Sequence, residues 1–250
     1  MELTNYDKWL DGAKTILIKF AEALVAAHNW YERNAEKIAK YLLVFADFAV
    51  WCSATDKLTK NQIVFTDDLS IEFAEKICKS ENVQELVEEY YFDNDEQNMR
   101  MLMDRCEAYK ETAPYKELYI QTLDAYQRAQ YHLACIGMFS LLDGVLADVS
   151  HMITATNFKS RIQAIESKIS NKIELNEIDR KTLCIYTSIE QMKDSVFGDS
   201  RFTDVEPEGI NRHWVIHGRT RKVYLKYDFL KVLLCLDAIC YMSHLADTIN

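Results

Sequence analysis

The chain has 250 residues, and only six of them are Gly and two are Pro, so few residues are available for tight turns. This composition argues against an all-β fold. The hydrophobic share of 49% and the charged share of 27% are close to the globular average, which argues against wholesale disorder. The formal net charge of −10 argues against a protein that coats nucleic acid with its whole surface, but leaves room for a local basic patch.

Cysteine usage and hydropathy indicate the compartment. The seven cysteines are widely spread and never form a Cys-x-x-Cys pair, so neither a disulfide framework nor a zinc ribbon is indicated. The amino terminus carries acids where a signal peptide needs a basic region. The most apolar runs, around 132–142 and 232–242, are about half as long as a membrane span. We expect a cytoplasmic protein with reduced thiols and no membrane segment.

The first part of the chain predicts helices. Apolar residues recur at spacings of three and four over 6–28 and again over 32–52. Because the intervening segment 29–34 is short, we expect an antiparallel helical hairpin. The period fails over 53–70, which predicts a loop with at most a short strand at 63–65. Shorter helices are expected over 71–79, 83–91 and 96–110.

Two features precede the second half of the chain: an acidic stretch and then a proline. Residues 80–98 contain seven acids and no Lys or Arg, which indicates either a solvated acidic face or a docking surface for a basic protein partner. Pro114 lies in the polar segment Lys110–Lys116 and cannot continue a helix. We therefore predict two domains, residues 1–112 and residues 113–250.

The second half also predicts helices, which makes the expected fold all-α. A long helix over 118–151 contains a run that is apolar nearly all round and is expected at the centre of its domain. Amphipathic helices are expected over 158–170 and 177–197. A fifth element is predicted over 204–217, with Pro207 in its first turn and Gly218 as its stop, and a last helix over 227–246.

The most informative segment is basic, against the sign of the whole chain. Between Glu208 and Lys226 it holds five Lys or Arg and a single acid. His213 and His217 are four residues apart, so on a helix both rings can face one site. Arg212 and His217 differ by about 140°, so they can act together only if Arg212 curls around the helix or the helix ends early.

Residues 212–217 form an Arg-x4-His motif that resembles the signature of HEPN domains. In this all-helical superfamily an Arg, four to six residues and a His form a metal-independent ribonuclease site. His213 is one of the residue types common after that Arg, and Gly218-Arg219 is similar to many bacterial members of toxin and phage-defence systems. The order of helices resembles a HEPN helical bundle over the second half of the chain, and the residue match is confined to this segment.

The resemblance implies an endoribonuclease without metal or other cofactor. It gives His217 the general acid/base role, Arg212 the phosphate clamp and His213 a supporting role. An acid from an earlier helix often orients such a site, for which Asp143 is the first candidate and Asp148 the second.

The resemblance also implies partners. RNA is the expected substrate, and its backbone is expected to contact Arg219, Arg221, Lys222 and Lys226. Two motifs often meet across a homodimer, which is expected here through the C-terminal domain. A neutralising antitoxin would find a docking surface on the acidic N-terminal half.

Other interpretations stay open at this point. A non-catalytic HEPN-like module would use the same Arg and His to bind a nucleotide or a partner, and a helical adaptor would use neither. Arg212 and His213 are surface residues in the simplest interpretation, with His217 near the carboxyl end of the helix dipole. A zinc site at His213 and His217 lacks a Glu after His213 and a nearby Cys.

Overall fold

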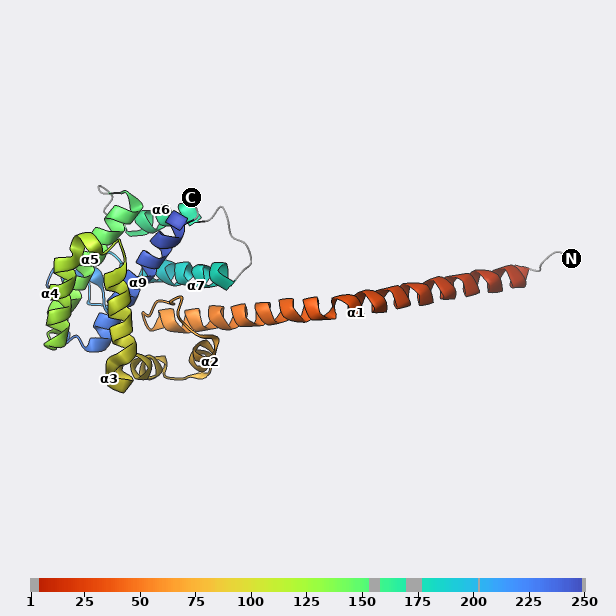
Figure 1. Ribbon diagram of the computed structural model, residues 1–250, viewed down its shortest axis with the longest axis horizontal. Helices are drawn as coiled ribbons and strands as arrows, with labels where there is room; N and C mark the ends of the chain where they lie inside the picture. Colours follow the sequence, from red (N-terminus) through yellow and green to blue (C-terminus); the bar gives the residue numbers. More distant parts are fainter. Residues whose placement is uncertain (1–4, 153–157, 170–176, 202, 249–250) are drawn as a thin grey trace. The chain divides into compact units, whose positions relative to one another are not determined.

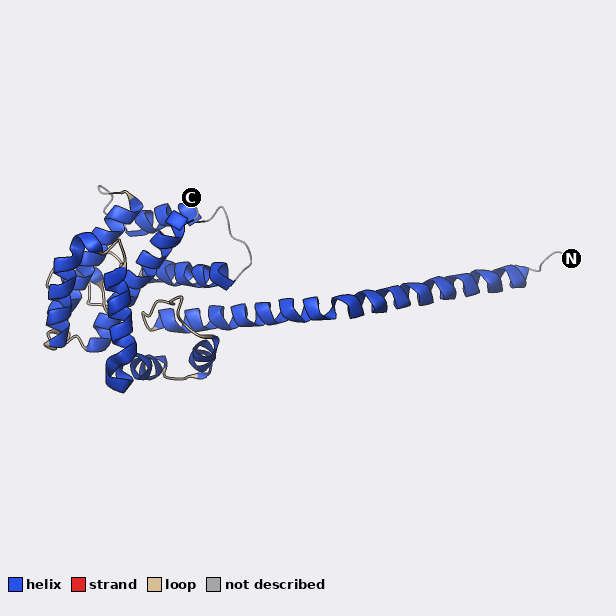
Figure 2. Ribbon diagram, viewed as in Figure 1, coloured by secondary structure: helices blue, strands red, loops and turns tan. Residues whose placement is uncertain are grey.

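The computed structural model describes residues 5–152, 158–169, 177–201 and 203–248. Every regular element in these residues is a helix, so the expected all-α fold is confirmed (Figure 2). The elements labelled in Figure 1 and the two short ones are α1 (Asn5–Lys60), α2 (Ile71–Lys79), α3 (Val83–Ala108), η1 (Ala113–Tyr115), α4 (Lys116–Gln127), α5 (Tyr131–Ser150), α6 (Phe158–Ile169), α7 (Glu177–Met192), α8 (Arg212–Ile216) and α9 (Lys226–Thr248).

The chain divides into two units, residues 1–48 and residues 49–250. The described part of the first unit is helical throughout and belongs to α1. The helical hairpin expected over 6–52 is therefore wrong, because the helix continues through residues 29–34 without a turn. These six residues include neither Gly nor Pro, so nothing in their local chemistry ends a helix.

The second unit is built around α5 and α9, which pack against each other. All side chains from Phe229 to Cys240 on α9 are buried, and α5 buries nine residues. Helices α4, α6 and α8 pack on α5, while α3 and α7 pack on α9 (Figure 1). By length and hydropathy α5 would also suit a membrane span, but half of its apolar window is buried inside the protein, which fits a core helix.

The predicted domain boundary at 112/113 lies inside the second unit. Pro114 sits in η1, the short turn between α3 and α4. Helices on its two sides are joined, because the Tyr119 hydroxyl on α4 donates a buried hydrogen bond of 2.7 Å to the Met103 carbonyl on α3. Proline here marks a turn between packed helices and not a linker.

The single long helix expected over 118–151 is wrong as well, because the chain turns between α4 and α5. Ala129 adopts a left-handed conformation with φ of 57°. The Gln130 amide then donates to the Ala125 carbonyl at 2.9 Å, five residues back, as in a Schellman ending. Such a stop usually contains Gly, and its absence hid the turn in the sequence.

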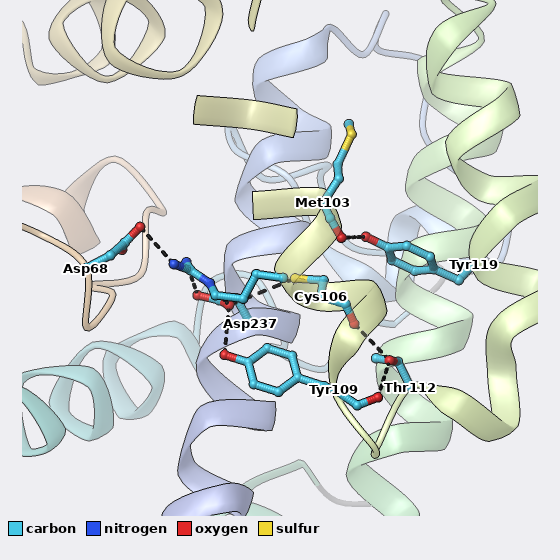
Figure 3. Close-up of polar contacts among 8 residues, drawn as sticks. Asp68, Met103, Cys106, Tyr109, Thr112, Tyr119 and Asp237 are labelled. Atoms are coloured by element: carbon cyan, nitrogen blue, oxygen red, sulfur yellow. Dashed lines mark hydrogen bonds and ion pairs between the residues drawn. The ribbon is translucent and has the colours of Figure 1, made fainter. Parts of the chain in front are cut away.

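A buried ion pair joins α3 to α9. Arg105 donates from Nε and Nη2 to the two carboxylate oxygens of Asp237, each at 2.7 Å, and its Nη1 reaches Asp68 Oδ2 at 2.9 Å. The Tyr109 hydroxyl donates to Asp237 Oδ1 at 3.2 Å (Figure 3). Burial raises the pKa of Asp237 to about 6, although Arg105 lowers it. Removing one partner of such a pair costs about 3–5 kcal/mol because a buried charge is left unpaired.

The remaining elements follow the prediction with local differences. The helices expected over 83–91 and 96–110 are the two halves of α3, which has non-helical backbone from Asp93 to Glu96. The loop predicted over 53–70 begins only after Lys60, because α1 continues to that residue. Residues 63–65 are buried in this loop without forming a strand. Ser70 caps α2, since its hydroxyl accepts from the Phe73 amide at 3.2 Å.

Candidate functional site

The candidate site is carried by α8, and one buried asparagine fixes the start of this helix. The Asn211 side-chain oxygen accepts from the amides of His213 and Trp214 at 3.0 and 3.3 Å. Its Nδ2 donates to the carbonyls of Ser195 and Gly198 at 2.8 and 3.0 Å. A helix of five residues is too short to be stable alone, so this anchorage to the segment after α7 positions it.

The helix predicted over 204–217 is therefore confined to Arg212–Ile216, and Pro207 lies in the preceding loop. A glutamine from the loop after α1 holds that loop. Ile210 donates to Gln62 Oε1 at 2.8 Å and accepts from Gln62 Nε2 at 3.1 Å. A Cβ on Gly209 would lie 2.0 Å from Gln62 Oε1, so a larger residue at 209 would displace the Gln62 amide from this position.

The end of α8 follows the prediction, with Gly218 as its stop. Gly218 has φ of 60°, and the Arg219 amide donates to the Trp214 carbonyl at 3.0 Å. His217 is the residue that caps the helix. The helix thus ends directly before His217.

Arg212 is held by an acid from the central helix. Its Nε lies 2.8 Å from both carboxylate oxygens of Asp143 on α5, and its Nη2 donates to Asp143 Oδ2. The two side chains are 31% and 26% exposed, so the pair lies at the surface of the second unit. The structure brings Asp143 to Arg212, whereas Asp148 accepts a hydrogen bond of 2.8 Å from the Tyr115 hydroxyl instead.

A second arginine lies beside this pair and was missed by the sequence analysis. Arg161 on α6 donates from Nη1 to the Asp143 carbonyl at 3.4 Å. No motif surrounds Arg161 in the sequence, and only the packing of α6 on α5 brings it there. The site thus contains two guanidinium groups and one carboxylate.

The two histidines form a ring pair. The centroids of the His213 and His217 rings are 4.5 Å apart, and the ring planes differ by 60°. His213 is partly buried and His217 is exposed. Burial lowers the pKa of His213, and the charges of His217 and Arg219 lower it further. His213 is therefore neutral near pH 7, the state in which an imidazole can accept a proton.

The four residues expected to bind RNA differ in their surroundings. Arg219 lies over the Trp214 ring at 3.8 Å and donates to Ser200 Oγ at 2.8 Å. Lys222 donates to two backbone carbonyls of the preceding loop, and Lys226 Nζ lies 3.2 Å from Glu96 Oε1. The Arg221 side chain is exposed. Three of the four cations thus also contact the protein's own groups: Arg219 and Lys222 contact loops, and Lys226 contacts α3.

A polar cavity of about 560 Å³ adjoins the loop before α8. Gln62, Gln191, Glu208 and Lys231 are among its lining residues. Its lining does not include Arg212, His213 or His217. The cavity and the candidate site therefore lie at different places around the same loop.

Within residues 5–152, 158–169, 177–201 and 203–248, no three His, Cys, Asp or Glu side chains are grouped as a metal site would need. Comparison with protein-family models, with curated proteins and with solved structures finds no match for the chain.

Proposed function

We propose that the α8 segment is the catalytic site of a metal-independent endoribonuclease of HEPN type, in a cytoplasmic toxin or phage-defence system. The observation that carries the proposal is the pair of imidazole rings 4.5 Å apart on a five-residue helix whose first residue, Arg212, is held by Asp143. Two adjacent imidazoles and a positioned guanidinium are the groups that RNA cleavage without metal needs.

The histidines would move the protons of the reaction. One imidazole accepts the proton of the ribose 2′-hydroxyl, and the 2′-oxygen then forms a bond to the adjacent phosphorus. The bond to the 5′-oxygen breaks, and this leaving group takes the proton back from the same imidazole, which the first step has protonated. The products are a 2′,3′-cyclic phosphate and a 5′-hydroxyl. We assign the general acid/base role to His217, because it is exposed, and give the partly buried His213 the supporting role.

The arginines would stabilise the charge of the transition state. Asp143 binds the Nε and Nη2 edge of Arg212, which fixes the guanidinium plane and directs Nη1 away from the carboxylate. Asp143 also neutralises much of the Arg212 charge, so Arg161 supplies the additional positive charge that a phosphate requires. Arg221 is the exposed cation that would follow the RNA backbone, with Arg219, Lys222 and Lys226 adding to the local potential.

A second candidate is a non-catalytic module that binds a nucleotide or a partner through the same residues. The observation that favours it is the complete engagement of Arg212 Nε by Asp143, which is a stable structural ion pair in its own right. In that case the site would bind RNA or nucleotide and leave it uncut.

The test is cleavage of labelled RNA by the full chain in excess chelator, with analysis of the ends. We expect 2′,3′-cyclic phosphate ends, and loss of cutting in His217→Ala and in Arg212→Ala. Matched controls are His244→Ala and Arg100→Ala, which remove an exposed His and an exposed Arg outside the site and should cut normally. Thermal unfolding should stay close to that of the parent for all four variants, because surface changes usually cost within about 0.5 kcal/mol.

Two results would contradict the proposal. Strict dependence of cutting on a divalent ion would assign the chemistry to a different site. RNA binding without cutting at any enzyme concentration would favour the non-catalytic module.

A further inference from the structure

The first unit carries a heptad repeat that the proposed RNA cleavage does not use. Starting at Leu10, alternate steps of three and four residues lead to Phe48, and every position reached is apolar except Asn34. The repeat covers 39 residues without a break in register. A strict period of 3.5 residues over this length is the pattern of a coiled coil, whereas the helices of a globular core follow a period of 3.6. We call these positions the seam.

The seam has no cover within the first unit. The described residues of this unit form one continuous helix, so no second element is present there to pack on it. The seam residues Leu24, Tyr31 and Phe45 are 56%, 58% and 57% exposed. Helices of globular proteins owe most of their stability to a buried apolar face, so this helix needs a partner.

We propose that the seam pairs with the seam of a second copy of this chain, as a parallel coiled coil in register. Asn34 argues for this orientation. In a parallel pair in register, Asn34 meets Asn34 of the second copy, and the two amides can bond to each other. In an antiparallel pair centred on the repeat, Asn34 would face Leu24, which leaves a buried amide without a partner and costs about 1–3 kcal/mol.

Charge and area are also suited to self-association. Residues 1–48 contain seven acids and six bases, so two such helices do not repel each other although the whole chain carries −10. Nine of the seam residues are large and apolar. At about 60–100 Å² buried for each, the two helices together bury about 1,000–1,800 Å², which matches a standard stable interface.

A membrane is a weaker candidate for this helix. The candidate span covers Glu22–Lys37 and Leu42–Lys60. Residues 22–37 contain five charged side chains, Glu22, Glu32, Arg33, Glu36 and Lys37, whereas residues 38–55 contain only Lys40 and Asp47. Charges near the centre of a span are costly, and here they would lie in the middle of the repeat. In the coiled coil all five fall outside the seam and remain in water.

The experiment measures the mass of the full chain in solution by light scattering, at about 10 μM. We expect a dimer. Leu24→Asp and Phe45→Asp place a charge in the seam and should weaken the dimer by at least about tenfold in Kd, towards a monomer. The matched controls are Val25→Asp and Leu43→Asp, which remove equally exposed apolar residues, 58% and 66% exposed, outside the seam and should leave the dimer intact.

Disulfide cross-linking tests the orientation. Asn34→Cys should give a covalent dimer under mild oxidation, above any background of the parent protein. A mixture of Asn34→Cys and Leu24→Cys chains should give no preference for the mixed product.

A monomeric parent, equal dissociation by the control variants, or preferred cross-linking of position 34 to position 24 would each overturn the proposal. So would flotation of the parent with lipid vesicles that the seam variants lose. None of these measurements depends on RNA cleavage, so this proposal and the proposed function fail separately.

Discussion

At the scale of single residues, the candidate site depends on side chains that do no chemistry themselves. Asn211 makes four hydrogen bonds that fix the start of α8, and Gln62 bonds both backbone polar groups of Ile210 just before it. Pre-organisation of this kind holds reacting groups in one geometry. Residues outside the Arg-x4-His motif thus position Arg212 and the two histidines.

The lowered pKa of His213 gives a prediction at this scale. An NMR titration should find the pKa of His213 below its ordinary value of about 6.5, because burial and the neighbouring charges of His217 and Arg219 disfavour the imidazolium. Arg219→Gln removes one of these charges and should raise the pKa. The matched control Arg221→Gln removes an exposed charge two positions away and should leave it unchanged.

The sign of the stability effect follows from the same shift. Because the folded-state pKa is lowered, the contribution of neutral His213 to stability is present above the unfolded value of about 6.5 and is lost as pH falls through the folded pKa. A His213 pKa at or above the ordinary value would contradict both statements.

At the scale of helices, the turn between α4 and α5 gives a second prediction. Ala129 pays a steric cost for its φ of 57°, which Gly does not, so Ala129→Gly should stabilise the protein by up to about 1 kcal/mol. The control Ala125→Gly, inside α4, should destabilise it by about 1 kcal/mol. Urea unfolding measures both. Destabilisation of equal size by the two variants would mean that residue 129 is helical in solution.

The same turn shows what the sequence could and could not reveal about the fold. Spacings of three and four found the helices, because burial of one face leaves that pattern in the chain. The end of the helix at Ala129 and the continuity of α1 through residues 29–34 left no such signal. Neither segment contains Gly or Pro, the residues that usually mark the end of a helix. Asn211, which caps α8, is anchored by contacts with residues 195 and 198, and no local pattern predicts these contacts.

For the candidate site the limit was similar. Arg212, His213 and His217 are close in sequence, so their spacing alone predicted a common helix end. Asp143 could be singled out because an acid interrupts an apolar run, and the structure places it on Arg212. Arg161 lies in an ordinary amphipathic helix, so only the packing of α6 on α5 reveals it.

At the scale of the whole molecule, the expected meeting of two Arg-x4-His motifs across a homodimer predicts complementation. If each site takes Arg212 from one chain and His217 from the other, a parental dimer has two sites. Mixing Arg212→Ala with His217→Ala chains should then restore about a quarter of the parental cutting, because half of the dimers are mixed and each of these has one of its two sites complete. The measurement is RNA cleavage after subunit exchange. Leu24→Asp in both chains should weaken the restoration, since the coiled coil raises the local concentration of the partner. Mixed dimers without activity would mean that each chain contains its own site.

The burial of α9 on all sides has a consequence for how the chain acquires its structure during synthesis. Helix α5 leaves the ribosome about 80 residues before α9, its main partner in the core. At a synthesis rate of ~5–20 residues per second, the apolar surface of α5 stays exposed for roughly 4–16 s before α9 can pack on it. Asp143 and Arg212 are both synthesised before α9, but at that stage the core that holds them together has not closed. The nascent chain therefore exposes this apolar surface, which is the kind of surface that chaperones bind, until α9 has been added.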